Sequence, residues 1–175
     1  MEYGEKGQTV KCPSCDNKKT MKSEVVVHRF KESGLDNIIL YGVKQYRCLH
    51  CGEILFDYGN INQLNQIIAD TLLRKKNLLN GQEIRFLRTH VGYSSEMFAR
   101  IIGVDKTSLS RIENDRAKVS NQVNMAVRLA VAGKMADRDY DLHDLLEALE
   151  NNDLIEFKNA EFHTSGRGHW ELRSA

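Results

Sequence analysis

No part of this 175-residue sequence contains the run of about 20 apolar residues that a membrane-spanning helix needs. The N-terminus, Met1 to Lys11, also lacks the hydrophobic core of a signal peptide. Internal repeats and low-complexity segments are absent too. We therefore expect a cytoplasmic protein of one or two domains, with enough apolar residues to build cores.

The sequence also lacks the usual signs of an enzyme. It contains no nucleophile and base at a suggestive spacing and no phosphate-binding loop. Its net charge is only +1, so total charge does not indicate a nucleic-acid partner. The charges are unevenly spread, however, because residues 1–120 have an excess of Lys and Arg and residues 121–175 an excess of Asp and Glu. This asymmetry fits a polyanion-binding part followed by an acidic part.

All four cysteines occur in two Cys-x-x-Cys hooks, Cys12 with Cys15 and Cys48 with Cys51. Disulfides are not expected in the reducing cytoplasm. Two such hooks are typical of a tetrahedral zinc site, in which four thiolates complete the coordination shell. A closed shell has no position for water or substrate, so we expect one structural zinc ion that stabilises the fold without catalysis.

Two alternative interpretations concern the cysteine hooks. A Cys-x-x-Cys hook can be a redox dithiol, but no thioredoxin-like strand and helix pattern accompanies it. His50 lies inside the second hook and can replace a ligand, although a solvent-exposed residue is the simpler interpretation. Between the hooks, the β-branched and aromatic runs at 23–30 and 37–46 predict a small antiparallel sheet, with His28 on its surface.

From residue 62 onward, the spacing of the apolar residues along the sequence changes. Residues 62–80 have apolar side chains at helical spacing, which predicts one amphipathic helix. Arg74, Lys75 and Lys76 cluster at its end. Cations there complement the helix dipole, so a solvated helix end is the main interpretation and phosphate contact is the alternative.

Two short helices are predicted between Ser94 and Asn114. Ser94 is a typical N-cap for a helix that ends at Gly103, and Asp105 is a typical N-cap for the next helix. Two short helices joined by a three-residue turn with glycine form a helix-turn-helix unit. The second helix turns hydroxyl and cationic side chains outward, which suits a recognition helix.

This stretch resembles the lambda-repressor-like (XRE) DNA-binding domains without a gap. The matching positions are Ser94, Glu96, Phe98, Ala99, Gly103, Val104, Leu109, Ser110, Ile112 and Glu113. The sequence departs from the family pattern at Ser95, where Gln is frequent, and at Lys106 and Thr107, where amides are frequent. The resemblance also implies that Arg88 pairs with Glu113 inside the fold.

We predict contacts to DNA from this unit and from the polar loop after it. Arg111 is the candidate for a bidentate contact to guanine. Lys106 and Thr107 face the groove, whereas phosphates are assigned to Ser95, Ser108, Arg116 and Lys118. For Lys106 and Arg111 the alternative is an ordinary solvated charge. A single recognition helix reads few base pairs, so we expect a homodimer on a palindromic operator in double-stranded DNA.

The remaining sequence predicts more helix and a short extended tail. Ser120 can cap a helix that continues to Ala132 and ends at Gly133. The leucine stripe Leu142, Leu145, Leu146 and Leu149 predicts another amphipathic helix, either as core or as a self-association surface. Short extended pieces follow between Leu154 and Leu172, with Phe157, Phe162 and Trp170 to bury.

We therefore predict an α+β protein with four regions. These are a zinc-ribbon domain with a small antiparallel sheet (1–60), a linker helix (61–80), an all-α lambda-repressor-like helix-turn-helix domain (81–135), and an acidic C-terminal extension of one helix and short extended pieces (136–175).

The combination resembles the MqsA/YgiT-type zinc-finger antitoxins and related transcriptional regulators, over about residues 11–132. The resemblance is based on Cys12-Pro-x-Cys15, Cys48-x-x-Cys51-Gly52-Glu53 and the segment 82–114. It implies a structural metal, a ribbon that binds a small RNA-cleaving toxin, and repression of the protein's own operon. The Asn and Arg that read DNA in that family correspond to Thr107 and Arg111, so only the Arg is kept. A stand-alone zinc-containing regulator without a toxin is the alternative.

Overall fold

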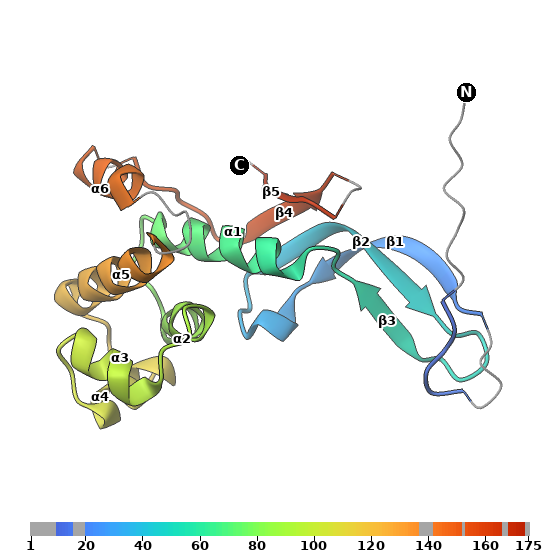
Figure 1. Ribbon diagram of the computed structural model, residues 1–175, viewed down its shortest axis with the longest axis horizontal. Helices are drawn as coiled ribbons and strands as arrows, with labels where there is room; N and C mark the ends of the chain where they lie inside the picture. Colours follow the sequence, from blue (N-terminus) through green and yellow to red (C-terminus); the bar gives the residue numbers. More distant parts are fainter. Residues whose placement is uncertain (1–9, 16–19, 137–141, 152, 166–167, 174–175) are drawn as a thin grey trace.

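The computed structural model describes residues 10–15, 20–136, 142–151, 153–165 and 168–173. The molecule is elongated, with a β-sheet at one end, a group of helices at the other, and helix α1 (Ile61–Leu73) between them (Figure 1). The fold is therefore mixed α+β, as predicted. Among the described helices, none has the length and apolar character needed to span a membrane.

The sheet is built around strand β2 (Ile38–Arg47). Strand β1 (Lys22–Arg29) pairs antiparallel along one side of β2 and confirms the predicted hairpin between the cysteine hooks. The other side of β2 is shared by two strands. Its C-terminal part pairs with β3 (Ile54–Asp57), and its N-terminal part pairs in parallel with β4 (Ala160–Thr164), which in turn pairs with β5 (Trp170–Leu172).

Gly42 marks the point where β2 changes partner from β3 to β4. The β1–β2 register shifts there, because Val26 pairs with Val43 and Val27 with Tyr41, so Gly42 is the extra residue of a β-bulge. Its φ of 85° is in the left-handed region, which favours glycine. A Cβ at this position would also lie 2.7 Å from a methyl carbon of Thr164 on β4. The missing side chain therefore allows β4 to approach the bulge.

The last strands correct the predicted organisation. Residues 136–175 were predicted to be a separate extension, but β4 and β5 belong to the N-terminal sheet. Buried Trp170 fixes this arrangement, because its indole Nε1 donates to the Tyr58 carbonyl at 2.8 Å and its backbone N–H and C=O both bond the Gln63 side chain. The prediction missed the pairing because it joins strands about 120 residues apart in sequence, which a local pattern does not show.

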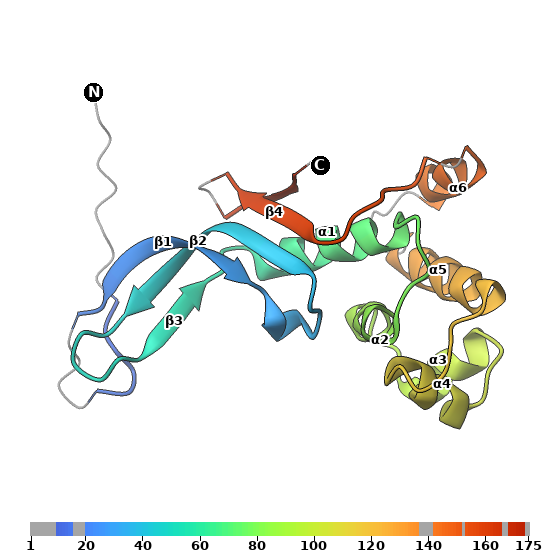
Figure 2. The same ribbon diagram turned by 180° about the vertical axis from the view of Figure 1, so that it is seen from behind.

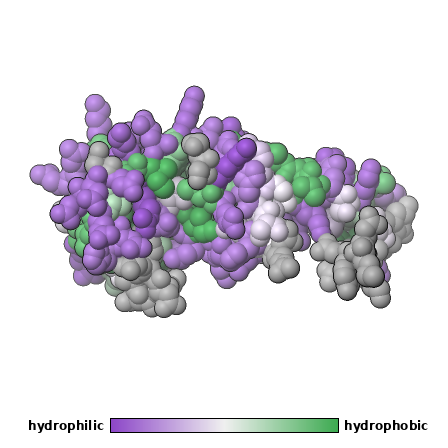
Figure 3. All heavy atoms as spheres, turned by 90° about the horizontal axis from the view of Figure 1, so that it is seen from above, coloured by the Kyte–Doolittle hydropathy of each residue, from purple (hydrophilic) through white to green (hydrophobic). Residues whose placement is uncertain are grey.

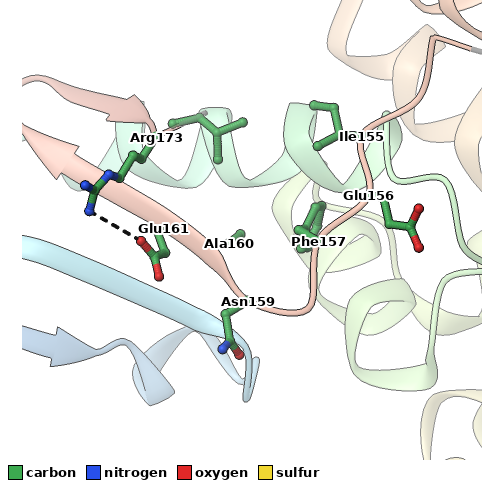
Figure 4. Close-up of a pocket in the computed structure, with 8 residues that line it drawn as sticks. Ile155, Glu156, Phe157, Asn159, Ala160, Glu161 and Arg173 are labelled. Atoms are coloured by element: carbon green, nitrogen blue, oxygen red, sulfur yellow. Dashed lines mark ion pairs between the residues drawn. The ribbon is translucent and has the colours of Figure 1, made fainter. Parts of the chain in front are cut away.

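The chain leading into β4 borders an open groove of about 680 Å³ (Figure 4). Ile155 and Phe157 form part of its apolar lining, and the ion pair of Arg173 with Glu161, 3.8 Å long, lies beside it. Figure 2 shows the same segment running from α6 past α1 to the sheet. The segment also bonds the end of α1, since Lys76 N–H donates to the Ile155 carbonyl.

Helix α1 covers one face of the sheet. Asn60 caps its N-terminus, and its predicted apolar stripe is buried through Leu64, Ile68 and Leu72. These residues share one core cluster with sheet residues such as Leu40 and Phe162. At about 25 cal/mol per Å² of apolar surface, each such leucine contributes roughly 2 kcal/mol by leaving water.

The end of α1 differs from the predicted solvated terminus. Arg74 pairs with Asp70 at 3.0 Å and Lys76 lies 3.7 Å from Glu156, but Lys75 is buried. Its Nζ bonds both carboxylate oxygens of Glu83, at 2.7 and 2.9 Å. Glu83 is completely buried and also completes the capping box with Asn80 at the next helix. Lys75 therefore connects α1 to the helical end and does not lie in solvent.

Arg128 forms a second connection that the sequence did not indicate. Its guanidinium is buried and donates to the carbonyl groups of Leu72, Leu73, Lys75 and Asn77 at the end of α1. The Leu73 carbonyl is in the last turn of α1, where carbonyls have no partner within the helix, and Lys75 and Asn77 lie in the segment that follows α1. Burial lowers the pKa of Arg128, and the nearby negative charge of Glu83 opposes that effect.

Among the described residues there are five further α-helices, α2 (Gly81–His90), α3 (Ser95–Ile101), α4 (Lys106–Glu113), α5 (Asn121–Ala136) and α6 (Leu142–Glu150), and a short 3-10 helix, η1 (Lys31–Ser33), follows β1. Ser120 caps α5 as predicted, but the predicted end at Gly133 is wrong. Val131, Ala132 and Met135 are all buried, so their packing contacts stabilise the helix beyond Gly133. The leucine stripe is divided, since Leu145 of α6 is buried and Leu146 is exposed.

Candidate metal centre and DNA-reading helix

The two cysteine hooks meet at the far end of the sheet from the helices. Cys48 follows β2, and a tight turn returns the chain to β3, with Gly52 N–H bonded to the Cys48 carbonyl at 3.0 Å. Cys12 lies in the segment that precedes β1, and the hydrogen bond of Met21 N–H to the Val10 carbonyl, 2.8 Å long, joins this segment to the start of β1. The β1–β2–β3 meander thus brings together hooks that are over thirty residues apart.

The four Sγ atoms all lie within 4.8 Å of one another. Cys12 and Cys51 are separated by 3.5 Å between sulfurs, and Cys15 and Cys48 by 3.6 Å. Metal–sulfur bonds of about 2.3 Å in a tetrahedron place the sulfurs about 3.8 Å apart. The four cysteines therefore form a cluster that can hold a metal ion, and no disulfide joins them.

The protonation of the cluster supports the same conclusion. Backbone N–H groups of Cys51 and His50 lower the pKa of the Cys48 thiol to about 6. The neighbouring Cys51 thiol and burial raise the pKa of Cys15. Several thiolates this close repel one another, so a cation is needed for all four to ionise together.

The two histidines considered as possible ligands, His28 and His50, lie outside the sulfur cluster. His50 is exposed on the turn, as the simpler interpretation held. His28 lies on the sheet, where its Nε2 is 3.1 Å from Glu32 and 3.2 Å from the Tyr58 hydroxyl. Burial and the Glu32 carboxylate raise the pKa of Tyr58, so its hydroxyl stays protonated. Neither histidine belongs to the sulfur cluster.

At the other end of the molecule, α3 and α4 form the predicted helix-turn-helix. The Ser94 and Asp105 side chains accept hydrogen bonds from Met97 N–H and Ser108 N–H, so both predicted N-caps are confirmed. Gly103 has a φ of 75° in the turn, which favours glycine. The inner faces of the two helices bury Phe98, Ala99, Leu109 and Ile112.

A buried ion pair braces the back of the recognition helix α4. Arg88 of α2 donates to the two carboxylate oxygens of Glu113, at 2.6 and 3.1 Å, and to the Tyr93 carbonyl. This confirms the pairing implied by the resemblance. Bidentate pairs of this kind fix orientation as well as adding energy, so Arg88 holds α4 at a defined angle to α2.

Gly81 determines how closely α2 approaches the end of α4. A Cβ at Gly81 would lie 2.2 Å from the Ile112 carbonyl oxygen, which is backbone and cannot rotate away. Gly81 N–H also donates to the Asp115 carboxylate at 2.9 Å. Asp115 has a φ of 54°, so this hydrogen bond holds a residue whose backbone lies in the left-handed region.

We predict that Gly81→Ala lowers the free energy of unfolding by about 2 kcal/mol through this overpacking. The matched control is Gly133→Ala, because a Cβ at exposed Gly133 in α5 meets nothing within 4 Å. The control is expected to raise stability by about 0.5–1 kcal/mol, since alanine favours helix. Denaturant titrations measure both changes, and equal stabilities would contradict the close approach.

The structure places the predicted DNA contacts as follows. Lys106, Thr107 and Arg111 are exposed on α4, with Thr107 and Arg111 one helical turn apart on a common face. Arg116 and Lys118 are exposed in the loop after α4, and Ser95 is half-buried at the start of α3. The exposed side chains have the access that a groove contact requires, and the contacts themselves stay predictions.

Ser108 is engaged within the protein. Its hydroxyl donates to the Asp105 carboxylate at 2.5 Å, so its single proton is already used. This bond and the Ser108 N–H lower the pKa of Asp105. A phosphate contact by the Ser108 hydroxyl therefore requires a change of partner. Arg85 is a further exposed cation near α4, and it donates to the Asn114 side chain at 2.8 Å.

Comparison with known families agrees with this geometry. A sequence model described as helix-turn-helix matches residues 84–123, which extend from α2 through α3 and α4 into α5. No curated protein matches the chain in a sequence comparison. The chain thus contains a DNA-binding helix-turn-helix region of the XRE type and, at its other end, a four-cysteine cluster suited to a metal ion.

Proposed function

We propose that this protein is a sequence-specific transcriptional repressor that binds a palindromic operator in double-stranded DNA as a homodimer in the cytoplasm. The main support is the orientation of α4. Its inner face is buried through Leu109 and Ile112, and its outer face presents Thr107 and Arg111 to solvent. A helix held in this way, with cationic and hydroxyl side chains outward, suits the major groove.

We further propose that the metal is a single zinc ion with a structural role. Cys12, Cys15, Cys48 and Cys51 would hold it as thiolates, which is a common ligand set for structural zinc. When bound, the ion supplies cross-links between the two hooks. Because four protein ligands complete its coordination, we propose no catalytic activity for the protein.

We also propose, from the resemblance to MqsA-type proteins, that it acts as an antitoxin that represses its own operon and binds an RNA-cleaving toxin through the sheet end. The elongated shape supports this division, since the sheet end and α4 lie apart (Figure 1). The alternative is a regulator without a toxin. Co-expression with the neighbouring gene, followed by purification and a growth assay, distinguishes the two.

Arg111→Ala tests the DNA-reading assignment. We expect affinity for the operator to fall about 5- to 150-fold, which corresponds to the roughly 1–3 kcal/mol of a bidentate guanine contact. Binding to unrelated DNA should persist and remain sensitive to salt. The operator is first isolated by selection from random DNA, and affinities are then measured by fluorescence anisotropy over a salt series.

Arg116→Ala is the matched control, because it removes an exposed cation from the loop beside α4. It should weaken binding to all sequences similarly and lower the salt slope by about one. An equal loss on operator and unrelated DNA with Arg111→Ala would contradict its role as a base-reading residue.

A further inference from the structure

An open pocket of about 450 Å³ lies where the sheet, the start of α1 and helix α2 meet. In Figure 1 the segment 31–33, which is η1, and α2 both lie below α1, and both border the pocket. The sheet side supplies Phe30, Glu32 and Tyr58, and α2 supplies Phe86 and His90. The volume is within the range of about 300–1,000 Å³ that is usual for small-molecule sites.

Aromatic side chains line this pocket on two sides. The rings of Phe30 and Tyr58 on the sheet side are 5.0 Å apart between centroids, and the rings of Phe86 and His90 on α2 are 6.0 Å apart. Ile61 of α1 adds an aliphatic side chain between them. Seen from above, the molecule is mostly hydrophilic, and apolar residues gather in separate patches (Figure 3). A concave site with apolar walls therefore differs from the general surface and suits the hydrocarbon part of a small ligand.

Glu32 gives the pocket its negative charge. Among the described residues that line it, Glu32 is the one acidic side chain, and none is a lysine or arginine. Burial opposes the ionisation of Glu32, but hydrogen bonds from its own backbone N–H, from His28 and from Tyr58 outweigh burial and lower its pKa. Its side chain is 50% exposed. A carboxylate can accept about four hydrogen bonds, so Glu32 can also accept one from a ligand.

We propose that this pocket binds a small organic cation, in which an ammonium group is attached to an apolar body. The ammonium pairs with Glu32, and the apolar body packs between the aromatic side chains of the sheet side and those of α2. An anionic ligand would meet the Glu32 carboxylate with no lysine or arginine in the lining to balance it. The inference goes beyond the proposed function, because neither the recognition helix nor the four cysteines border this pocket.

A ligand in this position contacts both ends of the molecule. Residues 30–33 belong to the sheet end, and α2 carries Arg88, which holds Glu113 at the back of α4. A ligand that binds the folded protein and not the unfolded chain stabilises the fold by mass action. We therefore expect the cation to raise the melting temperature of the full chain.

Two probes of nearly the same shape test the ligand class. One is 2-phenylethylammonium chloride, and the other is 2-phenylethanol, which has a neutral hydroxyl in place of the ammonium. Calorimetric titration of the zinc-loaded full chain at about pH 8, above the usual titration range of histidine, should give a dissociation constant of about 1 mM or lower for the cation. The alcohol should bind about five- to tenfold more weakly.

Amide NMR spectra recorded with the same probes locate the binding site. The largest shift changes are expected in residues 30–33, 58–65 and 86–90, which border the pocket. Equal affinity for the two probes would overturn the proposal. So would the absence of any binding at about 10 mM of the cation, or shift changes confined to other parts of the chain.

Two variants remove the two features of the site separately. Glu32→Gln removes the charge and keeps the shape, so affinity for the cation should fall about five- to tenfold, to that of the alcohol. Thr89→Phe fills the pocket from α2 and should abolish binding of both probes. Thr89 is exposed, and its hydroxyl bonds carbonyl groups of its own helix, those of Arg85 and Phe86. Both variants are therefore expected to fold, which thermal melting checks.

Glu156→Gln is the matched control. It removes an exposed carboxylate from the neighbouring groove of about 680 Å³ and should leave the affinity for the cation unchanged. A loss of binding with Glu156→Gln and not with Glu32→Gln would assign the cation to that groove and overturn the proposal. Unchanged affinity in the Glu32→Gln variant would also overturn it.

Discussion

Replacement of Cys48 by serine, or removal of the metal by a strong chelator, is expected to unfold the distal part of the sheet. Almost nothing else stabilises this region, because its local core consists of Cys12, Cys15, Met21 and Cys48 with a few partly buried neighbours. Apparent binding energies of structural zinc in small fingers are about 10–16 kcal/mol, and that binding energy is folding energy. The loss should therefore be the largest of any single change considered for this protein.

The unfolding should be local. Ile38 and Leu40 at the other end of β2 belong to the main core with α1 and the helices, so that part is expected to stay folded. Hydrogen exchange measured by mass spectrometry should show lost protection in residues 20–26 and 44–57, with α2 to α5 unchanged. Metal content is measured in the same samples. Acidification should release the metal too, because protons compete for the thiolates.

His50→Ala is the control for this experiment, since His50 lies within the second hook but is exposed and outside the sulfur cluster. It should keep both the metal and the protection pattern. Full protection in a metal-free Cys48→Ser protein would show that the sheet does not depend on the cluster.

Glu83→Gln is expected to lower the free energy of unfolding by about 3–5 kcal/mol, the usual cost of breaking a buried ion pair. The glutamate is completely buried, its carboxylate bonds Lys75 Nζ at 2.7 and 2.9 Å, and the Asn80 N–H donates to the same carboxylate. With glutamine in its place, the buried ammonium of Lys75 has no compensating charge. The midpoint of a urea titration should fall, while its slope remains unchanged.

Two further variants show whether the cost comes from the unpaired charge. Lys75→Met combined with Glu83→Gln removes that charge and should recover part of the stability. Glu96→Gln changes an exposed glutamate of α3 and should alter stability by less than about 0.5 kcal/mol. The ion-pair explanation would be wrong if the double variant were as unstable as the two single losses added together.

The features predicted well from the sequence are those whose causes lie within a few residues. Asp105 caps α4 because a carboxylate three residues before a free N–H can accept its hydrogen bond. Gly103 permits the left-handed turn, and the Cys-x-x-Cys spacing forms each hook by itself. The pairing of Arg88 with Glu113 spans 25 residues, and it was anticipated only through the resemblance to XRE domains.

The features that were missed depend on partners far away in the chain. Lys75 has the same local sequence context as its neighbours Arg74 and Lys76, and only the position of Glu83 across the helix junction makes it buried. In the sequence, Arg128 is one more cation on an amphipathic helix. In the structure it donates to the carbonyls of Lys75 and Asn77, more than 50 residues earlier in the chain. Gly133 normally ends a helix, but buried neighbours on both sides continue α5 through it.

The sequence by itself determined the local elements of this protein: two cysteine hooks, a hairpin between them, an amphipathic helix, and a capped helix-turn-helix with Arg111 outward. Backbone preferences and side-chain spacing act over a few residues and are visible in the sequence. Only the tertiary structure decided that β4 and β5 complete the N-terminal sheet, and that Lys75 and Arg128 join the two ends through α1. Those contacts depend on the burial of charged side chains, and burial is decided by segments that are distant in sequence. The cost of burying each charge is offset there by a matching charge or by carbonyl groups.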